Sequence, residues 1–138
     1  MTLTHNGYMK YTLPDNWRAE YDSDVLSIYD PCGKGAITMS FYNLLTGEKY
    51  VDEQISIMAK KFIDQNGVRL KDSFILLEKD GKAVLYGTGT TSDGWFIKIW
   101  VIAKCTKVVF ATYESKRKSK EVKVCDSIMD SIQFMEKC

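Results

Sequence analysis

The sequence of 138 residues contains a single histidine, His5, and two prolines. Nucleophilic catalysis needs an activating base beside the nucleophile, and histidine is the commonest such base. His5 precedes the first predicted strand, in a segment that we expect to be loosely ordered. We therefore predict no catalytic residue and no enzyme.

Clustered metal ligands are also missing, because the four cysteines are widely spaced and form no C-x-x-C pair. We predict no metal site and no cofactor. In a reducing cytosol such cysteines are free thiols, three packed as small hydrophobes and one on a frayed tail. A disulfide framework is the alternative interpretation of the same four residues: Cys32, Cys105, Cys125 and Cys138.

No apolar run reaches the roughly 18–20 residues that span a bilayer, since Lys98 interrupts the longest candidate, Phe96–Ala103. The N-terminus lacks both the basic region and the apolar core of a secretory signal. Nineteen Lys and Arg oppose eighteen Asp and Glu, so the chain lacks the excess charge of a dedicated nucleic-acid binder. We expect a cytoplasmic protein that binds neither membrane nor nucleic acid.

The residues that are present favour one folded domain over 1–138, because 45% of them are apolar and no linker composition occurs. Each proline ends a strand-like run, Tyr8–Leu13 or Val25–Tyr29. The segment Asp30–Gly35 is a predicted turn. It lacks the spacing of a phosphate-binding loop and precedes a strand pattern, Ala36–Asn43, rather than a helix.

Two amphipathic helices are predicted from apolar residues that recur with the helical period. The first, Val51–Asn66, ends before Gly67, which can adopt the left-handed conformation of a helix stop. The second is Ser119–Phe134. Their apolar stripes are Val51, Ile55, Met58, Ala59, Phe62 and Ile63, and Val122, Cys125, Ile128, Met129 and Ile132.

Four strands joined by short turns follow the first helix, and Asp80-Gly81 favours a type I′ hairpin turn between the first two. Such short connections require an antiparallel meander. The last strand is followed by the second helix. The predicted strands are Phe74–Lys79, Lys82–Thr91, Trp95–Lys104 and Val108–Tyr113.

The strand Trp95–Lys104 is apolar on both faces, apart from Lys98 and Lys104. A sheet with one solvated face would alternate more cleanly. We therefore predict an α+β fold, a layered sandwich of an antiparallel sheet flanked by two amphipathic helices.

The segment Met9-Lys-Tyr-Thr-Leu-Pro-Asp-Asn-Trp17 resembles the L-P-x-x-W entry hairpin of the Mog/PsbP-like superfamily. The order of the predicted elements also fits that fold, and the end of Ser127-Ile-Met-Asp-Ser-Ile-Gln-Phe134 is similar to the S-I-x-F ending of many members. The resemblance covers nearly the whole chain and implies the fold.

Members of that superfamily bind GTPases, sit in photosystems, or act as chaperones and adaptors for secreted bacterial toxins. Neither the surface that Mog proteins use on their GTPase nor the metal sites of PsbP match positions here, so the resemblance implies no functional residue. Fold analogy alone does not establish an activity.

One strong charge cluster stands out, and its placement before a helix N-terminus opposes the helix dipole. A contact with an acidic partner would explain that cost, although a solvated loop is the alternative. Exposed aromatic residues beside Lys98 could line a groove for an apolar partner. The candidate partner-binding residues are Phe96, Lys98, Trp100, Lys116, Arg117, Lys118, Lys120 and Lys123.

These features favour a non-enzymatic protein-binding module, in a bacterium an adaptor, chaperone or toxin-neutralising partner; the sequence also allows a homodimer. The alternative is a carrier of a small apolar ligand between sheet and helix. Gly87 and Gly89 would open its pocket, unless a helix packs closely against them. An enzyme acting through carboxylates comes third. Asp126 and Asp130 are one such pair, but an exposed helix face is the favoured explanation of their spacing.

Overall fold

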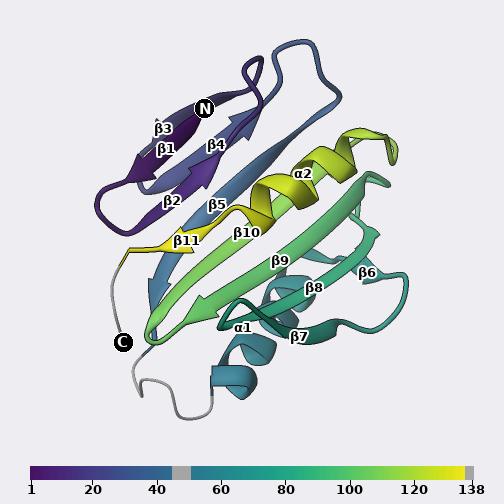
Figure 1. Cartoon of the computed structure of the whole chain (residues 1–138). Coiled ribbons are helices and arrows are strands. Elements are labelled where there is room, and N and C mark those ends of the chain that lie inside the picture. Colours follow the sequence, from purple (N-terminus) through teal and green to yellow (C-terminus); the bar gives the residue numbers. More distant parts are fainter. Residues whose placement is uncertain (45–50, 136–138) are drawn as a thin grey trace.

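The fold was analysed in a computed structural model, which describes residues 1–44 and 51–135. An eight-stranded antiparallel sheet forms its centre (Figure 1). β6 and β7 both pair with β8, at different stretches of its edge. In spatial order the strands are β3 (Arg18–Asp22), β4 (Val25–Tyr29), β5 (Gly35–Asn43), β10 (Lys107–Ser115), β9 (Phe96–Lys104), β8 (Lys82–Thr90), β6 (Arg69–Leu70) and β7 (Ile75–Lys79).

The predicted meander is confirmed, because β7, β8, β9 and β10 are consecutive antiparallel strands. Asp80 and Gly81 both have positive φ, 52° and 76°, as a type I′ turn requires. Cys105 also has a positive φ of 57° in the turn between β9 and β10. Each strand begins or ends within two residues of its predicted boundary.

A second sheet of three strands lies beside the first and was not predicted. It consists of β1 (Thr2–His5), β2 (Met9–Thr12) and β11 (Gln133–Phe134). The backbone N–H of Thr12 donates to Ser131 Oγ at 2.8 Å, and that of Met135 donates to the carbonyl of Tyr8 at 3.1 Å. These bonds tie the N-terminal hairpin to the end of the second helix.

The second predicted helix, Ser119–Phe134, is therefore too long. α2 covers Glu121–Asp130, and Gln133–Phe134 form strand β11 against Lys10 and Met9. Ile132 continues the apolar stripe of the helix in sequence, but it is buried after the helix has ended. Pairing with β2 satisfies backbone groups that a longer helix would bond internally.

α1 (Val51–Asn66) has the predicted boundaries and covers one face of the sheet over β8 and β9. Gly67 follows it with a φ of 64°, as expected of a helix stop. Ile55 and Ala59 are fully buried in a core that contains alternate residues of the neighbouring strands. These strand residues are Leu85, Ile97, Ile99, Val101, Ala103, Val108 and Phe110.

The opposite face is covered jointly by α2 and the three-stranded sheet, as Figure 1 shows. Trp100 and Ile102 of β9 point to this side and pack with apolar residues of β2 and α2. Both faces of β9 are thus buried, which explains its unbroken apolar sequence. The fold is α+β with an antiparallel sheet and two helices, and the extra sheet shares the second layer with α2. The buried residues that β2, α2 and the segments after them contribute to the core on this face are Met9, Tyr11, Leu13, Cys125, Ile128, Met129 and Ile132.

Candidate protein-binding surface

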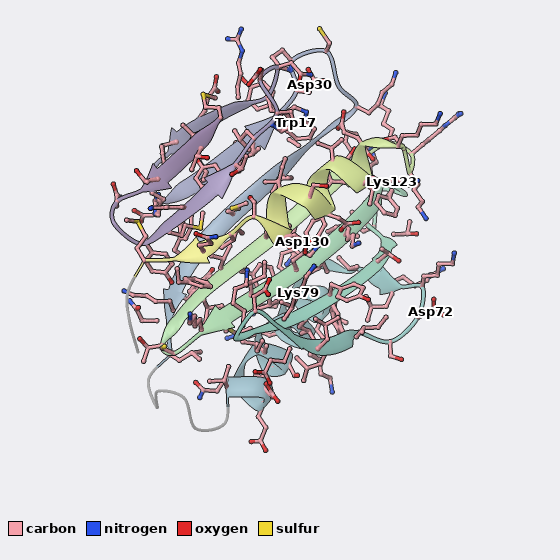
Figure 2. The ribbon with its side chains drawn as sticks, viewed as in Figure 1. Trp17, Asp30, Asp72, Lys79, Lys123 and Asp130 are labelled. Carbon is pink, nitrogen blue, oxygen red and sulfur yellow. The ribbon has the colours of Figure 1, made fainter. Side chains whose placement is uncertain are left out.

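Five of the eight predicted partner-binding residues form one exposed basic surface at the N-terminal end of α2. They lie in the loop after β10 and on the first turns of the helix, where Figure 2 labels Lys123. We call them the basic loop cluster. Its members are Lys116, Arg117, Lys118, Lys120 and Lys123, and all five are exposed.

The Glu121 carboxylate, on the first turn of α2 beside this cluster, holds the Asp30–Gly35 turn. Its oxygens accept hydrogen bonds from the backbone N–H groups of Lys34 and Gly35, both at 3.0 Å. The Tyr113 hydroxyl donates a third bond at 3.0 Å, and burial raises the pKa of that hydroxyl. A Cβ at Gly33 would lie 2.2 Å from Glu121 Oε2, so the turn approaches the carboxylate closely. The Asp30–Gly35 turn is therefore docked onto the start of α2.

Within the described parts of the chain, the positive charges of the basic loop cluster are not paired with carboxylates. Among these residues, no carboxylate lies within 4.0 Å of a cation of the basic loop cluster. Lys120 occupies the N-cap position of α2 without a side-chain capping bond, so a cation stands at the positive end of the helix dipole. Lys34, exposed on the docked turn, adds a further positive charge that the sequence did not identify.

A surface hollow of about 490 Å³ is lined by both the docked turn and the start of α2. Lys34 and Lys120 line it together with Trp17, Cys32 and Val124. Trp17 and Asp30, labelled in Figure 2, lie at the same end of the molecule as Lys123. The signal for this hollow was absent from the local sequence, because its walls come from segments about ninety residues apart.

The other three predicted residues, Phe96, Lys98 and Trp100, lie along β9 on the face beneath α2. Phe96 is half-buried, packs edge-on against Tyr113 and pairs with Ser115, so it adjoins the start of the basic loop. Trp100 is 3% exposed and belongs to the core. The expectation that it lines an open groove is wrong, because α2 and the three-stranded sheet cover its face of the strand.

Lys98 is also unavailable to a partner. Its amine is 2.7 Å from Asp126 Oδ1, and its side chain is 12% exposed. The same amine lies over the rings of Tyr86 and Trp100, at 5.2 and 5.3 Å from their centres. Lys98 thus fixes α2 to the sheet.

The two carboxylates of α2 that sequence spacing singled out are each paired with a lysine. Asp126 binds Lys98, and Asp130 lies 3.1 Å from Lys79 Nζ, a pair whose two members Figure 2 labels. Each lysine offsets the repulsion between the carboxylates. In the parts that the structure describes, no group of three or more His, Cys, Asp or Glu side chains could hold a metal ion.

His5 is not in a loose segment, contrary to expectation. It belongs to β1, its ring stacks on Phe41 with 3.9 Å between centroids, and its Nδ1 is hydrogen-bonded to the Tyr21 hydroxyl. Burial lowers the pKa of His5. Aromatic packing accounts for its position in the fold.

The cysteines differ from the expectation of four free thiols. Cys105 is disulfide-bonded, so that expectation is wrong at this position. Cys32 is free and exposed, and Cys125 is free and buried. Burial raises the pKa of the Cys125 thiol to about 12. The expectation of a frayed Cys138 lies outside the described residues.

Gly87 and Gly89 do not open a pocket. A Cβ on Gly87 would lie 2.8 Å from the Phe74 ring, and one on Gly89 would lie 2.4 Å from the carbonyl oxygen of Arg69. The edge segment that precedes β7, rather than a helix, occupies the space that the glycines leave.

An open groove lies elsewhere, between α1 and the strands β5 and β10. Its volume is about 480 Å³. α1 covers β8 and β9, and the groove follows where that cover ends. The polar alternation of β5 was the available signal for it, because Thr38, Ser40 and Tyr42 face a side that the core does not fill. Apolar walls come from Leu44, Met58, Phe62 and Phe110.

Comparison with known proteins identifies a fold and no family. No protein-family model matches the chain, and no curated protein matches it. The solution structure of cyanobacterial PsbP (CyanoP) from Synechocystis sp. PCC 6803 is similar over 97% of this chain and 91% of its own, with a TM-score of 0.72 and 10% sequence identity. The PsbP-like fold expected from the resemblance is confirmed.

A crystal structure from Bacteroides thetaiotaomicron is similar over 99% of this chain and 48% of that chain, with a TM-score of 0.59 and 11% identity. This chain thus corresponds to about half of that longer protein. At such identities the likeness concerns the fold alone. Within residues 1–44 and 51–135, no helix is both long and apolar enough to cross a membrane.

Proposed function

We propose that this protein is a non-enzymatic binding module that recognises an acidic surface of another protein through the basic loop cluster. In a bacterium it would act as an adaptor, a chaperone or a toxin-neutralising partner. The observation that carries the proposal is a set of five exposed cations with no acidic neighbour in ion-pair range among the described residues.

The ordering of the Asp30–Gly35 turn, which carries the exposed Lys34 beside the basic loop cluster, supports the proposal. Binding costs less conformational entropy when the contacting segment is already ordered. Glu121, bonded to the Lys34 and Gly35 amides, orders the turn beside the cluster before any partner arrives. Clustered charge of one sign also accelerates association with an oppositely charged surface.

The test uses a charge-reversed variant and a matched control. The variant is Lys116→Glu, Lys118→Glu and Lys120→Glu; the control, Lys10→Glu, Arg18→Glu and Lys71→Glu, makes the same charge change at exposed positions elsewhere. Lysates of the source cells, with and without nuclease treatment, are passed over each immobilised protein, and bound proteins are quantified by mass spectrometry.

We expect a stoichiometric acidic protein that binds the wild type and the control, is lost from the variant, and binds more weakly as salt rises. Equal capture by the variant and the control would contradict the proposal. Partner binding that disappears on nuclease treatment would also contradict it, because nucleic acid would then be the ligand.

A second candidate function, carriage of a small apolar ligand, is favoured by the groove between α1 and the strands β5 and β10. Its volume of about 480 Å³ falls in the range of small-molecule sites. Met58, Phe62 and Phe110 offer apolar contact, and Lys61 could meet a polar head group. The layered arrangement of sheet and helix would hold the ligand at the edge of α1.

Native mass spectrometry of freshly purified protein tests this second function. A carrier would retain an added mass of a few hundred daltons, and Ser40→Trp, which fills the groove, would lose it. Thr4→Trp, at an exposed position on β1 away from the groove, serves as control. A bare polypeptide mass for the wild type would count against carriage.

The cytoplasmic location expected from the sequence stays a prediction. The cysteines no longer favour the cytoplasm, because the disulfide at Cys105 is typical of oxidising compartments. Trapping thiols with an alkylating agent in intact cells would decide this, since a cytoplasmic protein would be trapped with Cys105 reduced.

A further inference from the structure

β7 is an edge strand whose side chains are all exposed. Ile75, Leu76 and Leu77 expose 50%, 42% and 37% of their surface. The strand pairs with β8 on one side, and no described strand pairs with the other side. Natural edge strands are commonly protected by charge, proline or a bulge, and an apolar open edge marks a site of strand addition.

The backbone groups that face outward can be identified from the neighbouring ladder. Thr91 N–H donates to the carbonyl of Trp95, so odd-numbered residues of β8 bond to β9. Even-numbered residues of β8 therefore bond to its other edge, as the bond from Lys71 N–H to the Thr88 carbonyl confirms. In β7, the residues that bond to the even-numbered residues of β8 are Ile75, Leu77 and Lys79. The N–H and C=O groups of Leu76 and Glu78 point away from the sheet.

α1 extends the exposed surface on one side of this edge. Leu76 shares a surface hollow of about 420 Å³ with Asp52, Glu53, Ser56 and Ile57. Ile57 is 65% exposed, the most exposed of the large apolar residues that the structure describes. A strand added to β7 would cover Leu76 and Ile57 on this side, and Ile75 and Leu77 on the other.

We propose that the occupant of this edge is a second copy of the chain, whose β7 pairs antiparallel with the first about a two-fold axis at Leu76. In this register Leu76 lies opposite Leu76 of the second copy, and Ile75 opposite Leu77. Hydrogen-bonded pairs between the two copies can form only between residues whose backbone groups point outward. The nearest alternative registers that meet this condition have their axis at Ile75 or at Leu77.

Both shifted registers are worse. An axis at Ile75 brings Glu78 opposite Asp72 and Lys79 opposite Lys71 of the second copy, and like charges directly opposed are destabilising. An axis at Leu77 brings Leu76 opposite Glu78 and Ile75 opposite Lys79. Of the three registers, only the axis at Leu76 places each of Ile75, Leu76 and Leu77 opposite an aliphatic side chain of the second copy.

Charge complementarity on α1 favours the same axis. Asp52, Ser56 and Lys60 are exposed and spaced by four residues, so they share one side of the helix, the side that borders Leu76. A two-fold axis perpendicular to the sheet places the two copies of α1 antiparallel. With Ser56 near the axis, Asp52 of each copy lies opposite Lys60 of the other. A second copy thus matches the edge in both apolar pattern and charge.

Sedimentation equilibrium of the wild type, and of variants at these positions, tests the proposal. We expect the wild type to reach twice the chain mass of 15.8 kDa as concentration rises. Leu76→Lys should raise the dimer dissociation constant about 100-fold, because two charges would meet at the axis. Lys10→Glu, at an exposed position on β2, should leave it unchanged.

A charge swap keeps the test specific. Asp52→Lys alone should weaken the dimer, and Asp52→Lys with Lys60→Asp should restore it. Hydrogen exchange at the Leu76 and Glu78 amides should slow in the dimer. A wild type that stays monomeric, a dimer insensitive to Leu76→Lys, or a swap that restores nothing would overturn the proposal. Because the basic loop cluster is not altered by these variants, capture of an acidic protein can fail or succeed independently.

Discussion

Lys98 and Lys79 make ion pairs with carboxylates one helical turn apart on α2, in different surroundings. The Lys98 side chain is 12% exposed, and that of Asp126 is 41% exposed. Lys79 and Asp130 are 50% and 58% exposed. An exposed pair contributes little to stability, whereas removal of one member of a covered pair leaves a charge that water reaches poorly.

We therefore expect Asp126→Ala to lower the free energy of unfolding by about 2 kcal/mol. Asp130→Ala should lower it by less than about 1 kcal/mol. Urea unfolding of both variants measures the difference. Equal effects of the two substitutions would contradict this prediction, because they would mean that water reaches Lys98 as well as it reaches Lys79.

His5 should make stability depend on pH. Burial lowers its pKa in the folded state, so the unfolded chain binds a proton first as pH falls. The stabilising contribution is present above the unfolded pKa of about 6.5 and is lost as pH falls through the folded pKa. Relative to His5→Phe, which keeps a ring against Phe41, the wild type should lose stability between about pH 8 and about pH 5. Urea unfolding across that range checks this, and a constant difference would contradict it.

At the scale of single elements, the start of α2 depends on Glu121. Its carboxylate accepts two backbone amides of the docked turn and the Tyr113 hydroxyl. Glu121→Ala removes all three bonds and should cost about 2 to 3 kcal/mol. Glu114→Ala, at an exposed site on β10, should stay within about 0.5 kcal/mol of the wild type.

Thermal unfolding measures those costs, and hydrogen exchange locates them. The Lys34 and Gly35 amides should exchange faster in Glu121→Ala than in the wild type. Unchanged exchange at both amides would show that the turn is held by other contacts.

Elements with a strong local pattern could be predicted from the sequence. α1 was placed correctly because its apolar stripe and Gly67 are adjacent in the chain. The β7–β8 hairpin was placed from Asp80 and Gly81. β1, β3, β6 and β11 were missed. β1, β6 and β11 have only two to four residues, and such short strands carry little pattern of their own. β11 pairs with a strand more than 120 residues earlier.

The candidate site was predictable in part for the same reason. The basic loop cluster is contiguous in sequence, so its charge was visible. The cover over Trp100 was not, because it comes from α2 together with an unpredicted sheet. Nor was the role of Glu121, whose partners Lys34 and Gly35 are distant in the chain.

At the scale of the whole molecule, the disulfide at Cys105 constrains the unfolded chain and so stabilises the fold. Reduction should lower the free energy of unfolding by about 2 to 4 kcal/mol. Urea unfolding with and without a reductant measures this. Cys105→Ser is the control, since its stability should not respond to reductant. A wild type of equal stability under both conditions would contradict the prediction.

The three-stranded sheet has a consequence for how the molecule is made. β2 is synthesised more than 120 residues before β11, yet the two strands are neighbours. During translation, Met9 and Tyr11 therefore cannot be buried in this part of the core until α2 and β11 have been synthesised. Until β11 has been synthesised, the nascent chain would present an incomplete apolar layer, to which a ribosome-associated chaperone could bind.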